Sequence, residues 1–232
     1  MQGMQTALIV PAFNEEPVLG QMLDAIPPGI FQLIIVADNG STDRTAEVAR
    51  AHGAAVVHEP ERGYGAACLK AIAALPPEIE ALVFMQADLS EDAAEARHLL
   101  NALETHDLVL GSRTMGEADP GALLPHQVFG NWVASTMVHL FYGYRYTDLG
   151  PFRAIRRDAL NRLGMKDRNY GWTIEMQVRA LEEKLRITEI PIHYRNRAAG
   201  ENKVSGNTKA SLMAGWKITS TVLKLWWAGQ AR

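Results

Sequence analysis

The sequence predicts an α/β fold with a mostly parallel, Rossmann-like sheet flanked by helices. Two observations support this prediction: apolar strand-like runs alternate with helical segments, and an acidic turn follows each of the first two strands. Strands that alternate with helices pair in parallel through right-handed crossovers. Since 47% of the 232 residues are hydrophobic, the chain can bury the core of one such domain.

The expected elements follow one another from the N-terminus. Apolar runs predict the strands, at 6–13, 33–37, 55–58, 82–85, 108–111 and 187–194. The helical segments are expected at 14–26, 45–52, 62–75, 129–141, 171–180 and 208–228. We expect Asn14 to cap the first helix and Asp92 to start one after the fourth strand. The last strand should lie at a sheet edge, because Pro191 has no N–H to donate to a ladder.

The strand at 82–85 leads into Gln86-Ala87-Asp88, which places Asp88 at the carboxyl edge of the sheet. Ligands bind at that edge in open α/β sheets. A carboxylate with oxygen acceptors nearby and no histidine or cysteine partner suits a hard divalent cation, Mg²⁺ or Mn²⁺. Helix capping by Asp88 and Ser90 explains the same residues equally well.

Composition excludes several other classes of protein. A formal net charge of −3 argues against a nucleic-acid binder, which would present a basic surface to the phosphates. The single cysteine, Cys68, excludes a disulfide framework and a thiolate metal site, and it favours a reducing, cytoplasmic compartment. We expect no signal peptide, and no apolar run reaches the roughly 18 residues of a membrane span.

The two acidic turns carry the first family resemblance. They suit ribose hydroxyls, a base N–H or a metal better than a phosphate, and the first lacks G-x-G-x-x-G. Residues 11–16 (Pro-Ala-Phe-Asn-Glu-Glu) and 38–43 (Asp-Asn-Gly-Ser-Thr-Asp) together resemble the nucleotide-binding opening of the family 2 glycosyltransferases, enzymes with a GT-A fold. The resemblance implies that the first motif lies against the nucleoside and that Asp38 contacts the base. From these turns it implies the donor-binding residues Pro11, Phe13, Asn14, Glu15, Asp38, Gly40 and Ser41.

Two later segments extend the implied donor site. The glycine-rich helix entry at 62–67 resembles the loop that borders the nucleotide sugar, and its free N–H groups favour an anion beside Gly63. Family members usually carry Asp-x-Asp where this chain has Gln86-Ala87-Asp88, so one negative charge is absent near the cation. We expect Asp88 to keep a metal-dependent function, with weakened affinity or with another ligand assisting. A protein that has lost catalysis is the alternative.

Residues 146–157, from Tyr-Thr-Asp-Leu to Arg-Arg, resemble the branch that includes dolichyl-phosphate mannose and glucose synthases. The resemblance favours a polyprenyl phosphate acceptor, which is already anionic and needs cationic partners. We name Arg113, His126 and Arg153 as its candidate ligands. A sugar or small-molecule hydroxyl would instead need a general base, for which Asp148 and Glu175 are the candidates.

The C-terminal part holds the last family-like block. Residues 195–206 resemble a basic loop that closes over the diphosphate, and we assign that role to Lys203, with Arg197 as a further candidate. We therefore expect a glycosyltransferase domain at 1–206 and an amphipathic helix at 207–232, packed on the domain, on a partner subunit or on a membrane surface. The aromatic residues of the helix at 129–141 are expected in the core.

The combined prediction is a metal-dependent inverting glycosyltransferase. It would move a sugar from a UDP- or GDP-sugar to polyprenyl phosphate, in the cytoplasm or on the cytoplasmic face of a membrane. Transfer to a hydroxyl and a non-catalytic nucleotide-sugar binding module are the alternatives. The sequence leaves open which nucleobase and which sugar the donor carries, and whether the protein forms a homo-oligomer.

Overall fold

The computed structural model of the chain describes residues 4–198 and 208–230, with side chains for 4–198 and 216–228. Lys203, our candidate for the diphosphate, lies outside the described residues. Seven strands form one sheet in the order β3-β2-β1-β4-β6-β5-β7. Their bounds are β1 Thr6–Ala12, β2 Leu33–Asp38, β3 Ala55–His58, β4 Ala81–Phe84, β5 Leu108–Ser112, β6 Arg153–Arg156 and β7 Ile187–Pro191.

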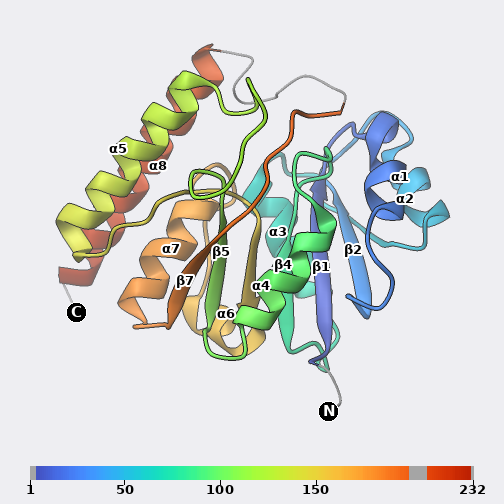
Figure 1. Ribbon diagram of the computed structural model, residues 1–232, viewed down its shortest axis with the longest axis horizontal. Helices are drawn as coiled ribbons and strands as arrows, with labels where there is room; N and C mark the ends of the chain where they lie inside the picture. Colours follow the sequence, from blue (N-terminus) through green and yellow to red (C-terminus); the bar gives the residue numbers. More distant parts are fainter. Residues whose placement is uncertain (1–3, 199–207, 231–232) are drawn as a thin grey trace.

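Helices lie on both faces of this sheet (Figure 1). They are α1 Glu16–Asp24, α2 Thr45–Ala51, α3 Tyr64–Ala73, α4 Ala96–Ala102, α5 Pro125–Tyr142, α6 Arg157–Leu163, α7 Trp172–Glu182 and α8 Thr208–Gln230, with a short 3₁₀ helix at Ala93–Glu95. The predicted α/β class is confirmed. As expected, β7 with its Pro191 lies at an edge of the sheet, next to β5.

Two buried clusters, one on each face, hold the sheet between the helical layers. Alternate residues of β1 point to opposite clusters, with Ala7 and Ile9 in one and Leu8 and Val10 in the other. This is the period of two that a strand imposes on its side chains. The first cluster also contains buried residues of α3, α5, α6, α7 and α8, and the second contains residues of α1, α2 and α4. Burial on both faces explains why β1 is a continuous apolar run.

Strand β6 is the one strand of the described sheet that the sequence analysis missed. It runs antiparallel to both of its neighbours, so that Arg153 pairs with Phe84 of β4 and Leu110 of β5. Its sequence, Arg-Ala-Ile-Arg, is short and charged at both ends, so it lacks the apolar run that predicts a buried strand. Helix α6 does begin at Arg157, directly after the strand.

Helices α5 and α8 lie side by side at one margin of the molecule (Figure 1). Helix α8 packs on the domain, because the rings of Phe141 and Trp226 lie 4.9 Å apart and Val222 is fully buried. The expectation that the aromatic residues of α5 lie in the core is wrong for two of them: Phe129 is 63% exposed and Trp132 is 57% exposed. At this margin the buried residues of α5 are Ala134, Ser135 and Val138, and the side chains of Phe129 and Trp132 lie on its exposed face.

Further apolar side chains are exposed on the same two helices, namely Leu140 of α5 and Trp216, Leu223 and Trp227 of α8. On α8, the spacing of seven and eleven residues from Trp216 puts these three on one stripe of the helix. Within the described residues, none of the helices has the length and apolar character needed to cross a membrane.

Candidate active site

The turns after β1 and β2 hold each other at the carboxyl edge of the sheet. The backbone N–H of Asn14 donates to Ser41 Oγ at 3.0 Å, and the N–H of Thr42 donates to Asn14 Oδ1 at 2.8 Å. Asn14 therefore does not cap α1 as expected: Glu15 is the N-cap residue, and Asn14 adopts a left-handed conformation with φ 51°. Its side chain ties the two turns together instead. Pro11, near the end of β1, pairs with Ala37 of β2 just below these turns.

Asp38 ends β2 with its carboxylate buried in this region. It accepts a hydrogen bond from the N–H of Ser41 at 3.0 Å, and His58 Nδ1 lies 3.1 Å from its other oxygen. Burial raises the pKa of Asp38, but the hydrogen bonds of Ser41 and His58 outweigh it, so that the pKa lies below its usual value. Gly40 lies in the same turn. His58 was not singled out from the sequence, although its place at the end of β3 brings it level with Asp38.

The loop before α3 is shaped by Asn39. Its Nδ2 donates to the carbonyl oxygens of Glu59 and Glu61, and its Oδ1 accepts from the N–H of Gly63 at 2.8 Å. This contact places the guanidinium of Arg62 over the ring of Phe13, 3.2 Å from its centroid. Asn39 belongs to the second motif of the sequence, at 38–43, but only the fold reveals its hydrogen-bond partners.

The helix entry at Gly63 is more tightly packed than the sequence analysis expected. A Cβ on Gly63, whose φ is 153°, would lie 2.0 Å from the carbonyl oxygen of Arg168. That same carbonyl accepts from the N–H of Ala66 at 2.9 Å. Two of the N–H groups expected to receive an anion are thus already paired, and the glycines allow a close approach of the 167–169 segment.

Asp88 follows β4 and is 2% exposed. Its Oδ1 accepts from the N–H of Ser90 at 3.0 Å and from Ser90 Oγ at 2.5 Å. Gln86 Oε1 accepts from the same hydroxyl at 3.2 Å, and Ala87 is buried between them. The second oxygen of Asp88, Oδ2, lies 3.1 Å from Nη1 of Arg197, whose Nη2 lies 3.1 Å from Glu15 Oε1. The ends of β1 and β4 and the segment after β7 therefore meet at Asp88.

The groups around Asp88 fit a hard divalent cation. The available donors are carboxylate and amide oxygens, and two carboxylates, those of Asp88 and Glu15, share one positive partner. No group of three His, Cys, Asp or Glu side chains able to hold a metal occurs among the residues that the structure describes. A cation held by one or two carboxylates, with substrate phosphates completing its coordination, is the usual arrangement for Mg²⁺.

Glu91 lies beside this cluster and was missed in the sequence. It is 2% exposed, its Oε2 accepts from the N–H of Gln86 at 2.8 Å, and its buried Oε1 has no hydrogen-bond partner within the described residues. Burial raises the pKa of Glu91 to about 8. A neutral carboxylic acid is thus favoured at this position. Nothing in the sequence distinguishes Glu91 from Asp92 and Glu95, which are only partly buried.

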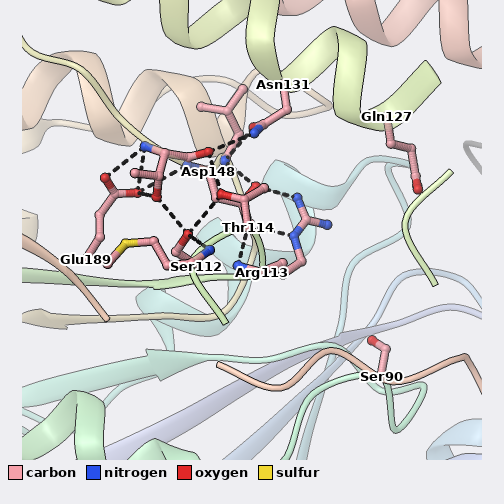
Figure 2. Close-up of polar contacts among 12 residues, drawn as sticks. Ser90, Ser112, Arg113, Thr114, Gln127, Asn131, Asp148 and Glu189 are labelled. Atoms are coloured by element: carbon pink, nitrogen blue, oxygen red, sulfur yellow. Dashed lines mark hydrogen bonds and ion pairs between the residues drawn. The ribbon is translucent and has the colours of Figure 1, made fainter. Parts of the chain in front are cut away.

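Arg113 and Asp148 face each other across the acceptor side of the site (Figure 2). Asp148 Oδ2 accepts from Arg113 Nε at 2.7 Å and from its backbone N–H at 2.9 Å, while Oδ1 accepts from Nη2 at 2.8 Å. Oδ1 also accepts from the N–H of Leu149 at 2.8 Å. Both oxygens of this candidate base are occupied by donors, and the charge of Arg113 is neutralised.

A polar network that the sequence analysis did not identify surrounds this pair (Figure 2). Glu189 of β7 accepts from the N–H and hydroxyl of Thr147, at 2.9 and 2.8 Å. Thr147 Oγ1 lies 2.7 Å from Ser112 Oγ. The backbone carbonyl of Thr147 accepts from Asn131 Nδ2 at 3.0 Å. The network joins the end of β5 and the middle of β7 to α5 and holds the 147–149 turn. These residues are distant in sequence, so no local pattern indicates them.

Three further candidates have different surroundings from those expected. Arg153 is fully buried and donates to the carbonyl oxygens of Thr173, at 3.0 Å, and of Gly150, so its guanidinium serves the core and does not face an acceptor. Glu175 is buried as well and accepts from the N–H of Asp167 at 2.6 Å and from Arg179 Nε at 2.8 Å. His126 is exposed in the first turn of α5.

The tied turns and the acidic cluster lie together at the carboxyl edge of the sheet, the edge at which a donor site is expected. Residues 7–164 match the profile described as "Glycosyl transferase family 2". The chain belongs to this family of glycosyltransferases. A relative in Mycobacterium tuberculosis, an uncharacterized glycosyltransferase, is 37% identical over 226 residues, which cover 95% of this chain and 100% of the relative.

One further relative of this glycosyltransferase and one solved structure with a similar fold carry more specific descriptions. An undecaprenyl-phosphate mannosyltransferase of Micrococcus luteus is 30% identical over 222 residues, which cover 88% of each chain. The solved structure of glucosyl-3-phosphoglycerate synthase from Mycobacterium tuberculosis, with Mn²⁺, UDP-glucose and phosphoglyceric acid, superposes with a TM-score of 0.78. It shares 22% identity and covers 97% of this chain and 80% of that one. The predicted GT-A fold is thereby confirmed.

Proposed function

We propose that this glycosyltransferase moves a hexose from a nucleoside-diphospho-sugar to a polyprenyl phosphate, with a divalent cation at Asp88. The observation that carries the choice of acceptor is that neither candidate base is available. Asp148 accepts from Arg113 and Leu149, and Glu175 accepts from Arg179 and two backbone N–H groups. A hydroxyl nucleophile needs a base to take its proton, whereas an ionised phosphate does not.

The reaction that follows from this is a single displacement. A phosphate oxygen of the acceptor would attack the anomeric carbon, the bond between that carbon and the diphosphate oxygen would break, and the nucleoside diphosphate would leave with the electron pair. No proton has to be removed from the nucleophile. Asp88 and Glu15 would hold the cation, which would neutralise the charge that develops on the leaving diphosphate.

The donor side is supported by the placement of the motif residues at one sheet edge. We propose that Asp38, positioned by Ser41 and His58, contacts the nucleobase of the donor. The turn that contains Phe13 and Asn14 would lie against the nucleoside. This site would also be lined by backbone or side-chain oxygens of Gly40, Gly63, Gln86 and Ala87. We keep Lys203 as the candidate for the diphosphate and Arg113 and His126 as candidates on the acceptor side. Arg153 is not retained there, because its guanidinium is buried in the core and donates to two backbone carbonyls.

The lipid part of the acceptor is supported by the apolar surface of α5 and α8. Phe129 and Trp132 lie near the start of α5, which follows the loop from the carboxyl end of β5. Exposed aromatic residues on an amphipathic helix are typical of contact with a lipid interface. The description of the Micrococcus luteus relative as an undecaprenyl-phosphate mannosyltransferase agrees with this choice.

A transfer assay with two matched acceptors tests the proposal. Purified protein would receive Mn²⁺ or Mg²⁺, a labelled UDP- or GDP-sugar, and either a short-chain polyprenyl phosphate or the corresponding polyprenol. We expect label in the organic phase with the phosphate alone, and none with Asp88→Ala. Transfer to the polyprenol at a similar rate would show that a base is present and would refute the argument from Asp148 and Glu175.

A non-catalytic nucleotide-sugar binding module is the second candidate, and Gln86 is the observation that favours it. In that case the protein would bind the nucleoside-diphospho-sugar but would transfer its sugar to neither acceptor. The substitution Gln86→Asp would then not produce transfer activity.

A further inference from the structure

Arg197 occupies the position at which the sequence predicts a metal ion. Its guanidinium joins two carboxylates from distant parts of the chain, with 3.1 Å to Asp88 Oδ2 and 3.1 Å to Glu15 Oε1. The side chain of Arg197 is only 21% exposed, and those of Asp88 and Glu15 are 3% and 8% exposed. Within the described residues, Arg197 is thus a cationic partner that these two nearly buried carboxylates share.

The contacts of Asp88 distinguish its two oxygens. Its Oδ1 already accepts two hydrogen bonds from Ser90, and its Oδ2 is the oxygen that faces Arg197. A divalent cation and the guanidinium cannot both bind Oδ2 from the same side. Gln86, whose Oε1 accepts from the same Ser90 hydroxyl, is neutral, so no further negative charge from this position compensates for two cations.

The present position of Arg197 also leaves one of its donors unsatisfied. Its Nε is buried and has no hydrogen-bond partner within the described residues. An unpaired buried donor costs free energy. The backbone around it is nonetheless anchored beside the site, since the N–H of Arg195 donates to Ser90 O at 2.8 Å and that of Ala198 donates to Asp88 O at 3.2 Å. The side chain can thus change partners while the segment that carries it stays at the cation position.

We propose that Arg197 acts as an internal substitute for the metal in the donor-free enzyme, so that a divalent cation and a nucleoside diphosphate bind together and neither binds well alone. This inference rests on the proposed donor and metal site. A cation arriving alone must displace the guanidinium from two carboxylates, which weakens its apparent affinity. A diphosphate supplies the negative charge that both the cation and the displaced guanidinium can bind. The two ligands are therefore coupled, each raising the affinity of the other by the same factor.

Mn²⁺ binding measured by electron paramagnetic resonance, with and without UDP or GDP, tests this inference. For the natural protein we expect Mn²⁺ alone to bind at least about tenfold more weakly than Mn²⁺ with the nucleoside diphosphate. Arg197→Ala should bind Mn²⁺ alone about tenfold more tightly than the natural protein, and the effect of the nucleotide should shrink. Arg195→Ala is the matched control, because the side chain of Arg195 pairs with Asp92 and not with the two carboxylates that Arg197 joins in the described part of the chain. Its Mn²⁺ affinity should be unchanged.

Two results would overturn the inference. The first is an Mn²⁺ affinity of the natural protein that does not depend on the nucleotide, a measurement that requires no variant and so remains decisive if Arg197→Ala fails to fold. The second is a folded Arg197→Ala that binds Mn²⁺ alone no more tightly than the natural protein. Neither measurement uses an acceptor, so a negative transfer assay would refute the proposed function without affecting this result.

Discussion

Arg113 and Asp148 form a two-point ion pair in which Nε and Nη2 of the arginine face the two carboxylate oxygens, at 2.7 and 2.8 Å. The side chain of Asp148 is 1% exposed and that of Arg113 is 14% exposed, so water cannot replace either partner. The pair joins the end of β5 to the turn before β6. It fixes the acceptor side of the site, and it removes the residue that a hydroxyl acceptor would need.

Asp148→Asn should therefore act first on stability. The substitution leaves the buried charge of Arg113 without its counter-ion, which costs on the order of 3 kcal/mol. We expect a clear fall in Tm, measured by differential scanning calorimetry. Asp158→Asn, which breaks an exposed pair with Arg162, is the control and should change little. A folded Asp148→Asn protein with unchanged Tm and a kcat reduced by orders of magnitude would instead identify Asp148 as a base.

Glu91 should make stability fall as the pH rises. In the folded protein burial raises its pKa to about 8, above the ordinary value of 4.5, so the folded state keeps a proton that the unfolded state releases. The stabilising contribution is complete below pH 4.5 and is lost as the pH rises towards 8, by at most about 1.4 kcal/mol per pH unit.

Glu91→Gln tests this directly, because an amide cannot ionise. Between pH 5 and about pH 8 the free energy of unfolding, measured with urea, should fall less steeply in the variant than in the natural protein. Glu104→Gln, at an exposed position, is the control and should keep the natural slope. Parallel slopes for all three proteins would mean that Glu91 is ionised in the folded state.

Two glycine substitutions should have opposite effects. A Cβ on Gly65 would lie 2.1 Å from the carbonyl oxygen of Asp167, so Gly65→Ala must displace the segment packed on α3 and should destabilise the protein by about 1–3 kcal/mol. Gly130 lies within α5 and a Cβ there meets nothing within 4 Å, so Gly130→Ala should stabilise by about 0.5–1 kcal/mol. Urea unfolding of both variants checks the pair, and equal effects would show that the contact at Gly65 relaxes freely.

The exposed aromatic residues of α5 should matter for a lipid acceptor and not for folding. We expect the double variant Phe129→Ser, Trp132→Ser to keep its Tm within about 1–2 °C, because surface substitutions change stability little. Its rate with a long-chain polyprenyl phosphate in phospholipid vesicles should fall about tenfold, while its rate with a soluble short-chain acceptor stays unchanged. A loss of the same size with the soluble acceptor would place these residues in the catalytic site instead.

The fold and the donor motifs could be predicted because their signals are local. The alternation of apolar runs and helices predicted most of the sheet, and the two motifs at 11–16 and 38–43 identified the edge at which the turns meet. Strand β6 escaped because its charged Arg-Ala-Ile-Arg sequence resembles a surface segment, although the sheet buries Arg153 and pairs its guanidinium with backbone carbonyls.

The sequence by itself determined the α/β class, the family and the position of Asp88 at a strand end, because residue order and period are enough for these. Only the tertiary structure decided which charges meet. It paired Asp148 with Arg113 and brought Arg197 to Asp88 and Glu15. It also buried Glu91, one oxygen of which has no hydrogen-bond partner in the part of the chain that the structure describes. Partners such as Glu15 and Arg197 are 182 residues apart, and the energy of a charge depends on its burial and its neighbours, neither of which a linear pattern contains.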